Sequence, residues 1–172
     1  LYAVATFGGG ESLRRFATAI VPAQVVAAST QSSLASLPAM VDVTTKSLQY
    51  PARVTALVLP MAVALFRITS PIQYLGVVAF ISWSMGIDLS LLQLASAVLL
   101  AVVISIGSVG LPGQASFMGT NLPVTQAVGL PIEPLGLLLA VDLIPDIFAT
   151  LGNVTAQLTV TSRVARAEDA EH

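Results

Sequence analysis

Residues 54–83 read VTALVLPMAVALFRITSPIQYLGVVAFISW, an apolar stretch of membrane-spanning length with a polar break at residues 66–71. Arg67 has more than one helical turn of apolar sequence on each side. An arginine in the middle of a bilayer costs about 2.5–3.5 kcal/mol even on insertion scales. Pro71 cannot donate a backbone hydrogen bond and therefore frees a carbonyl upstream. The pattern predicts a broken transmembrane helix whose arginine faces protein or water. Snorkelling of Arg67 to the membrane surface is the alternative.

The composition of the whole chain also indicates a membrane protein. Of its 172 residues, 55% are hydrophobic and 9% are charged, and the mean hydropathy is +0.87. Soluble domains carry about 25% charged residues, so this chain has too few to cover a particle in water. It has no cysteine, and its single histidine, His172, lies in a polar tail. We therefore expect no cofactor, no metal site and no enzyme. No basic stripe is present, so no nucleic-acid partner is expected either.

The distribution of charges predicts how the chain crosses the membrane. Cytoplasmic loops are enriched in Lys and Arg, so Asp88 and Glu133 are expected outside. Two segments must therefore enter the membrane and return to the side from which they came. They are residues 15–46, on the cytoplasmic side, and residues 88–133, on the outer side. Their arms are too short or too polar for a crossing of about 20 apolar residues. We therefore expect two re-entrant hairpins that enter from opposite sides; four ordinary spanning helices are the alternative. The residues expected on the cytoplasmic side are Arg14, Arg15, Lys46, Arg53, Arg163 and Arg166.

This topology predicts an all-α membrane protein with two re-entrant hairpins and two partly unwound transmembrane helices. The arrangement is an inverted repeat whose interrupted helices meet near the membrane midplane. Because the chain opens at Leu1 without an initiator methionine, we expect it to be the C-terminal portion of a longer protein. The predicted segments are the end of a preceding region (1–15), the first hairpin (16–46), the interrupted helix (50–86), the second hairpin (89–130), the last transmembrane helix (134–164) and a cytoplasmic tail (165–172).

Each predicted hairpin turns at a cluster that is suited to binding. The first turn holds Ser32 and Ser33, whose hydroxyls, together with backbone amides freed at a helix start, suit a carboxylate. Serines that pack helices together are the alternative. The second turn holds Gly110, Pro112 and Gly113, which allow a tight and mobile backbone. A plain surface turn explains this second cluster equally well.

The last predicted span carries its polar side chains on one face. Steps of four, seven and four residues place Asp142, Asp146, Asn153 and Gln157 on a single helical stripe. Two carboxylates in an apolar helix, with Arg67 as the midspan cation, indicate a functional site. A guanidinium there would pair with Asp142 or Asp146, or would hold a substrate carboxylate in a bidentate contact.

In their order and spacing these motifs resemble those of the dicarboxylate/amino acid:cation symporter family, over essentially the whole chain. The matching segments are the serine-rich residues 31–38, the Gly-Leu-Pro-Gly sequence at 110–113, and residues 142–146 and 153–157 of the last helix. The resemblance implies eight spanning helices and two hairpins in the complete protein. It further implies a homotrimer assembled through helices that precede this chain, contact with membrane lipid, and a multi-pass plasma-membrane location with a cytoplasmic C-terminus.

The resemblance also implies roles for individual residues. Ser33 and its neighbouring amides would hold a substrate carboxylate, Asp146 would receive the substrate amino group, and Asn153 would bind the main-chain carboxylate. Residues 110–113 would close as a gate. The predicted substrate-binding residues are Ser32, Ser33, Arg67, Ser70, Gly110, Pro112, Gly113, Asp146 and Asn153, and the predicted ion-coupling or charge network is Arg67, Asp142, Asp146 and Gln157.

Three positions depart from the pattern of that family. Ile68 and Gln157 stand where the family has aspartates that help to bind sodium, and Ala149 stands where it has the arginine that recognises an acidic side chain. We therefore predict a symporter that moves a small carboxylate-bearing solute, an amino acid or a dicarboxylate, by elevator-like alternating access without sodium coupling. The alternatives are a degenerate or truncated subunit without transport activity, and an anion-conducting channel.

Overall fold

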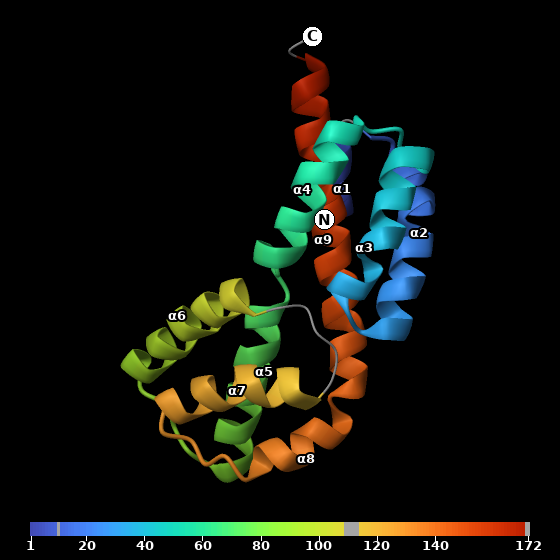
Figure 1. Ribbon diagram of the computed structural model, residues 1–172. Helices are drawn as coiled ribbons and strands as arrows, with labels where there is room; N and C mark the ends of the chain where they lie inside the picture. Colours follow the sequence, from blue (N-terminus) through green and yellow to red (C-terminus); the bar gives the residue numbers. More distant parts are fainter. Residues whose placement is uncertain (10, 109–113, 171–172) are drawn as a thin grey trace.

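The computed structural model describes residues 1–9, 11–108 and 114–170 (Figure 1). Every regular element in these ranges is helical, which confirms the all-α class. The elements are α1 (Tyr2–Gly9), α2 (Leu13–Thr30), α3 (Ser33–Asp42), the short π-helix η1 (Val43–Ser47), α4 (Ala52–Leu65), α5 (Ser70–Met85), α6 (Leu91–Gly107), α7 (Gln114–Ala127), α8 (Pro134–Val141) and α9 (Leu143–Ala170).

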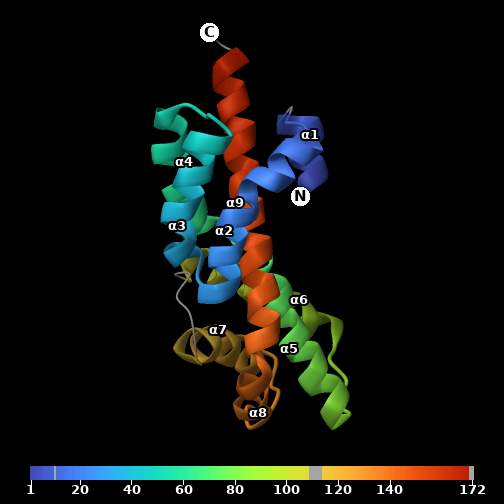
Figure 2. The same cartoon turned by 90° about the vertical axis from the view of Figure 1, so that its right-hand side faces the viewer.

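The long helix α9 joins two groups of helices (Figures 1 and 2). Helices α1 to α4 surround its C-terminal part, whereas α5 to α8 lie around its N-terminal end. The first group has a hydrophobic core that includes Phe16, Met40 and Leu158. The second group has its own core, which includes Ile81 and Phe117. Each group contains one of the two predicted hairpins, α2–α3 in the first and α6–α7 in the second.

One described helical stretch, Ala52–Met85, is long and apolar enough to cross a membrane. A second crossing is possible if α8 and α9 count as one broken span, since the two helices are bent by 66°. The bend lies within residues 134–164, the segment predicted as the last of two partly unwound transmembrane helices. Pro145 lies just beyond the bend and cannot donate to the carbonyl of Val141, which weakens the helix at this point.

Helix α6 buries small side chains and exposes large apolar ones. Ala97, Ala101 and Ser105 recur every four residues and are buried, whereas Leu92 and Leu99 are 78% and 68% exposed. A helix on the surface of a soluble domain has the opposite pattern. Small residues at helix contacts are typical of membrane proteins, because they let neighbouring backbones approach.

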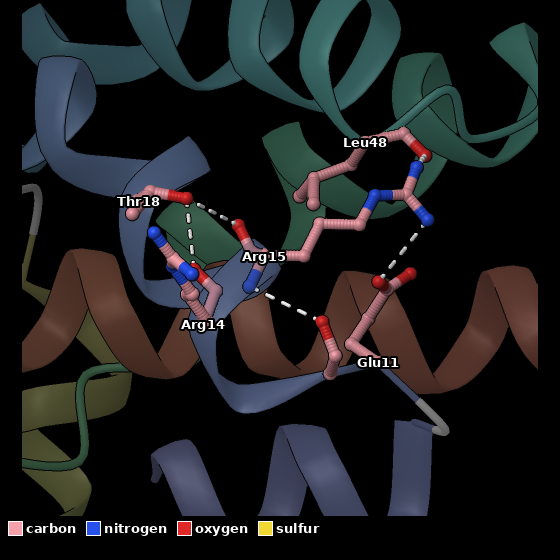
Figure 3. A network of polar contacts seen from close by, with 6 residues as sticks. Glu11, Arg14, Arg15, Thr18 and Leu48 are labelled. Atoms are coloured by element: carbon pink, nitrogen blue, oxygen red, sulfur yellow. Dashed lines mark hydrogen bonds and ion pairs between the residues drawn. The ribbon is translucent and has the colours of Figure 1, made fainter.

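Arg15 closes the base of the α2–α3 hairpin (Figure 3). Its Nη2 donates to the carbonyl of Leu48 at 2.9 Å, and its Nη1 lies 3.5 Å from Oε2 of the buried Glu11. Ser12 begins α2 as its N-cap and accepts from the Arg15 amide at 3.2 Å. These contacts join the start of the hairpin to a residue 33 positions later, so both ends of the hairpin lie on the same side of the molecule.

Candidate functional site

The interruption between α4 and α5 is held by two side-chain amides of α9. Nε2 of Gln157 donates to the carbonyl of Phe66 at 3.2 Å, and Oδ1 of Asn153 accepts from the Thr69 amide at 3.1 Å. Nδ2 of Asn153 also donates to Oγ of Ser70 at 3.3 Å. Both amide side chains are fully buried. One carbonyl and one amide freed by the break are therefore satisfied by side chains of α9.

Thr69 brings the break into direct contact with α9. Its Oγ1 donates to the carbonyl of Ala149 at 2.7 Å. A Cβ added at Gly152 would lie only 2.5 Å from Cγ2 of Thr69, far inside van der Waals contact. The close approach of α9 to the Thr69 side chain therefore depends on glycine at position 152.

Arg67 extends from the same break towards the end of α6. Its Nη1 donates to Oγ of Ser108 at 2.7 Å and lies 3.5 Å from the Ser108 carbonyl. Ser108 is the C-cap of α6, so the arginine of the broken helix contacts the second predicted hairpin. The three residues predicted for the turn of that hairpin, Gly110, Pro112 and Gly113, lie outside the described residues.

Arg67 shares a cavity of about 20 Å³ with both aspartates of the last span. Asp142 lies between α8 and α9, where its Oδ1 accepts from Nε2 of Gln73 at 2.9 Å. Asp146 follows one turn later, and its amide donates to the carbonyl of Asp142 at 2.9 Å. The two ion pairs formed within the described ranges do not include either aspartate. The charges are thus gathered around one cavity, without the direct Arg67–aspartate pair considered from sequence.

The predicted serines lie at the turn of the first hairpin and do not line this cavity. Ser32 and Ser33 are both buried, and Oγ of Ser32 caps α3 by accepting from the Ala35 amide at 3.1 Å. Gln31, which has a left-handed backbone with φ of 51°, donates through Nε2 to the carbonyl of Leu143 at 2.8 Å. The first turn therefore contacts the start of α9, close in sequence to the two aspartates.

The predicted site residues thus fall into three groups. Arg67, Asp142 and Asp146 line the cavity; Ser70, Asn153 and Gln157 hold the helix break; and Ser32 and Ser33 form the first turn.

Helix α7 supplies a wall of the cavity that is not predicted from the sequence. Thr120 and Asn121 of this helix are buried and line the cavity. Nδ2 of Asn121 donates to the carbonyl of Phe117 at 3.0 Å, whereas its Oδ1 has no hydrogen-bond partner among the described residues. The available signal is the polar character of residues 114–130, which by itself predicts a hairpin arm and not a binding wall.

An all-helical fold whose interrupted helices meet around half-buried charges is typical of membrane transporters. Comparison with known proteins supports that class. Residues 1–167 match the sodium:dicarboxylate symporter family, and the chain belongs to this family. The family predicted from the motifs is therefore confirmed.

Relatives of the chain include three animal transporters. Excitatory amino acid transporter 3 of Mus musculus is 37% identical over 141 residues, which cover 81% of this chain and 26% of the relative. An excitatory amino acid transporter of Caenorhabditis elegans is 34% identical over 140 residues, 81% of this chain and 27% of the relative. The putative sodium-dependent excitatory amino acid transporter glt-4 of the same organism is 33% identical over 153 residues, 88% of this chain and 30% of the relative. The chain spans between a quarter and a third of the length of these relatives.

We expect Gly152→Ala to destabilise the protein by about 1–3 kcal/mol, because the new methyl group collides with Thr69 and overpacks the break. Gly136→Ala in α8 is the matched control. No atom lies within 4 Å of the added Cβ there, so the higher helix propensity of alanine should be neutral or stabilising by up to about 1 kcal/mol. Thermal unfolding of the full-length protein in detergent measures both changes.

A second substitution tests whether the collision is the cause. Thr69→Ser removes the colliding methyl group but retains the hydroxyl that donates to Ala149. The double variant Gly152→Ala/Thr69→Ser should therefore recover most of the lost stability. Equal stability of the Gly152→Ala variant and the wild type would show that the two backbones do not approach this closely.

Proposed function

We propose that the protein forms the transport core of a symporter that moves a small carboxylate-bearing solute, an amino acid or a dicarboxylate, across the plasma membrane. The observation that carries this proposal is the cavity in which Arg67 lies with Asp142 and Asp146. A guanidinium offers a bidentate contact to a carboxylate, and a carboxylate accepts from an amino group. The names of the relatives, which are excitatory amino acid transporters, support the same class of solute.

The charges of the cavity favour an amino acid over a dicarboxylate. With all three side chains ionised, Arg67 contributes one positive charge and the two aspartates contribute two negative charges. A dicarboxylate would add two further negative charges to a site that already has an excess of one. An α-amino acid brings both signs and can place its amino group at Asp146 and its carboxylate at Arg67.

We further propose that α2–α3 and α6–α7 are re-entrant hairpins of an inverted repeat that moves in an elevator-like manner, in a homotrimer. Helix length supports the hairpins. At 1.5 Å per residue, the 10 residues of α3 extend about 15 Å and the 14 residues of α7 about 21 Å. A hydrocarbon core is about 30 Å thick, so neither helix reaches across it.

Sodium independence is also part of the proposal. A carboxylate at position 157 would face the Phe66 carbonyl oxygen. Both groups are hydrogen-bond acceptors, so a cation would be required between them. Gln157 instead donates directly to that carbonyl. Arg67 adds a positive charge beside the break. At about 6 Å and an effective dielectric of about 20, it repels a second monovalent cation by about 3 kcal/mol. Protons or the solute gradient would then drive transport.

Uptake by proteoliposomes that contain the full-length protein tests the transport function. We expect concentrative, saturable uptake of an L-amino acid. Asp146→Asn should weaken its binding by about 1.5–3 kcal/mol, because a charge-assisted hydrogen bond to the amino group is lost. Asp88→Asn, in an exposed loop, is the matched control and should have no effect. A small effect at Asp146 would exclude the amino-acid form of the proposal. Linear voltage-driven flux would indicate a channel, and absence of flux a subunit without transport activity.

Replacement of sodium by choline should leave the initial uptake rate of the wild type nearly unchanged. Arg67→Met should abolish or severely impair uptake.

Gln157→Glu should make both uptake and thermal stability depend on a monovalent cation, because two acceptors would then face each other at the break. Gln126→Glu, at an exposed position of α7, is the control for the added charge. Strict sodium dependence of the wild type would contradict this part of the proposal.

Thiol labelling tests the depth of the first hairpin. Ser29 is exposed on the molecule and lies two residues before its turn, so protein burial does not shield it. With Ser29→Cys, we expect no labelling by an impermeant maleimide added outside whole cells. Asp88→Cys, in the predicted external loop, should be labelled under the same conditions. Equal labelling of the two cysteines would favour four full spans.

A further inference from the structure

Cationic side chains gather at one end of the fold. Helices α2 and α4 begin, and α9 ends, at the same end of the molecule (Figures 1 and 2). Of the seven Lys and Arg residues in the chain, six lie near these helix ends or in η1, which contacts both α2 and α4. In the predicted topology this end lies on the cytoplasmic side of the membrane. The six residues are Arg14, Arg15, Lys46, Arg53, Arg163 and Arg166.

Two of these cations are neutralised by acids, whereas three have no partner on the described surface. Arg15 pairs with Glu11, and Lys46 pairs with Asp42. The exposed arginines whose side chains form no ion pair or hydrogen bond with the described residues are Arg14, Arg53 and Arg163. The remaining acids in this part of the sequence follow Arg166 and are Glu168, Asp169 and Glu171. This end of the fold therefore presents three uncompensated positive charges.

Helix stability does not account for two of these arginines. Arg14 lies in the first turn of α2 and Arg53 in the first turn of α4, and neither turn contains an acidic residue. A cation at the N-terminus of a helix opposes the helix dipole, which is unfavourable. Exposure instead leaves both guanidinium groups available to an anionic partner.

The third arginine borders an open apolar groove between α1 and α9. The groove has a volume of about 450 Å³, and its other lining residues are Ala3, Val4, Phe7 and Gly8. Phe7 is 91% exposed and Val4 is 53% exposed. The Arg163 side chain lies across Gly8, where an added Cβ would come within 2.7 Å of Nη1. An apolar groove with a guanidinium at its edge matches an acyl chain joined to a phosphate.

We infer that Arg14, Arg53 and Arg163, with the groove beside α1, bind anionic phospholipid of the inner leaflet. A guanidinium holds a phosphate in a bidentate contact, for which Arg is better suited than Lys. The cytoplasmic leaflet carries anionic lipids, and each basic residue near its surface adds to the attraction. The inference rests on the proposed function for the side of the membrane. It extends that function, because the three arginines belong to the first hairpin, the broken helix and the last helix of the transport core.

Thermal unfolding of the purified full-length protein in a neutral detergent tests the site without a transport assay. At low ionic strength, phosphatidylglycerol should raise the unfolding temperature, whereas phosphatidylcholine with the same acyl chains should not. High salt should reduce the effect by screening. Equal stabilisation by the two lipids, or by soluble glycerol phosphate, would overturn the site. Absence of stabilisation by phosphatidylglycerol would also overturn it, because the groove would then be covered within the full-length protein.

Single substitutions test the arginines. Arg14→Gln, Arg53→Gln and Arg163→Gln should each raise the half-saturating concentration of phosphatidylglycerol by about fivefold, without changing the unfolding temperature in the absence of lipid. Gln126→Glu is the matched control, because it makes the same change of net charge at an exposed position of α7, in the other group of helices. The control should bind the lipid as the wild type does. An equal loss in the control would show that the response follows net charge, and would overturn the site.

Uptake separates failure of the site from failure of the proposed function. The initial uptake rate of the wild type should differ between vesicles of pure phosphatidylcholine and vesicles with equal parts of phosphatidylcholine and phosphatidylglycerol. The triple variant Arg14→Gln/Arg53→Gln/Arg163→Gln should take up solute equally in both. Uptake by the wild type that is equal in both vesicles would overturn the effect of the site on transport and leave the transport function standing. Stabilisation by phosphatidylglycerol that depends on the arginines, in a protein that takes up no amino acid or dicarboxylate, would overturn the proposed function and support the site.

Discussion

The structure depends on the satisfaction of backbone groups at the break between α4 and α5. A helix interrupted at membrane depth leaves carbonyl and amide groups that lipid cannot hydrogen-bond, and each unsatisfied group costs several kcal/mol. In the described chain, Asn153 accepts from the Thr69 amide and donates to the Ser70 hydroxyl, and Gln157 donates to the Phe66 carbonyl. α9 must therefore lie directly against the break, which in turn requires glycine at position 152. The position of the longest helix in the fold follows from the chemistry of residues 66–70.

The use of amides at the break has an electrostatic consequence. A side-chain amide satisfies a carbonyl or an N–H without net charge, so the interruption does not need an ion to be stable. Asp142 and Asp146 instead lie about two to three turns before Asn153, and they surround the cavity together with Arg67 of the break. On the proposed function, stabilisation of the break and recognition of a charged group are thus carried out by different residues of the same two segments.

The sequence predicts the features that depend on local composition. The break at residues 66–71 is marked by an arginine and a proline in apolar surroundings, and the family is marked by the order of its short motifs. The position of the bend at Asp142 is not predicted, because the periodicity of residues 142–157 fits one straight helix although Pro145 weakens its start. The requirement for Gly152 and the wall formed by Asn121 are also not predicted. Both arise from contacts between segments far apart in the chain, and no local pattern encodes them.

The separation of the residues that hold the break from the charged residues of the cavity also bears on which residues could couple transport to a driving force. Coupling requires a charge whose binding differs between the two sides of the membrane. Gln157 is neutral, and the positive charge of Arg67 is covalently attached to the protein. Neither residue can carry such a difference. On the proposed function, the aspartates of the cavity carry it, because a carboxylate accepts a proton or an amino group reversibly. On the proposed function, the cavity is therefore the place where recognition of the solute and the driving force meet, and the break provides a rigid frame whose charge is constant through the cycle.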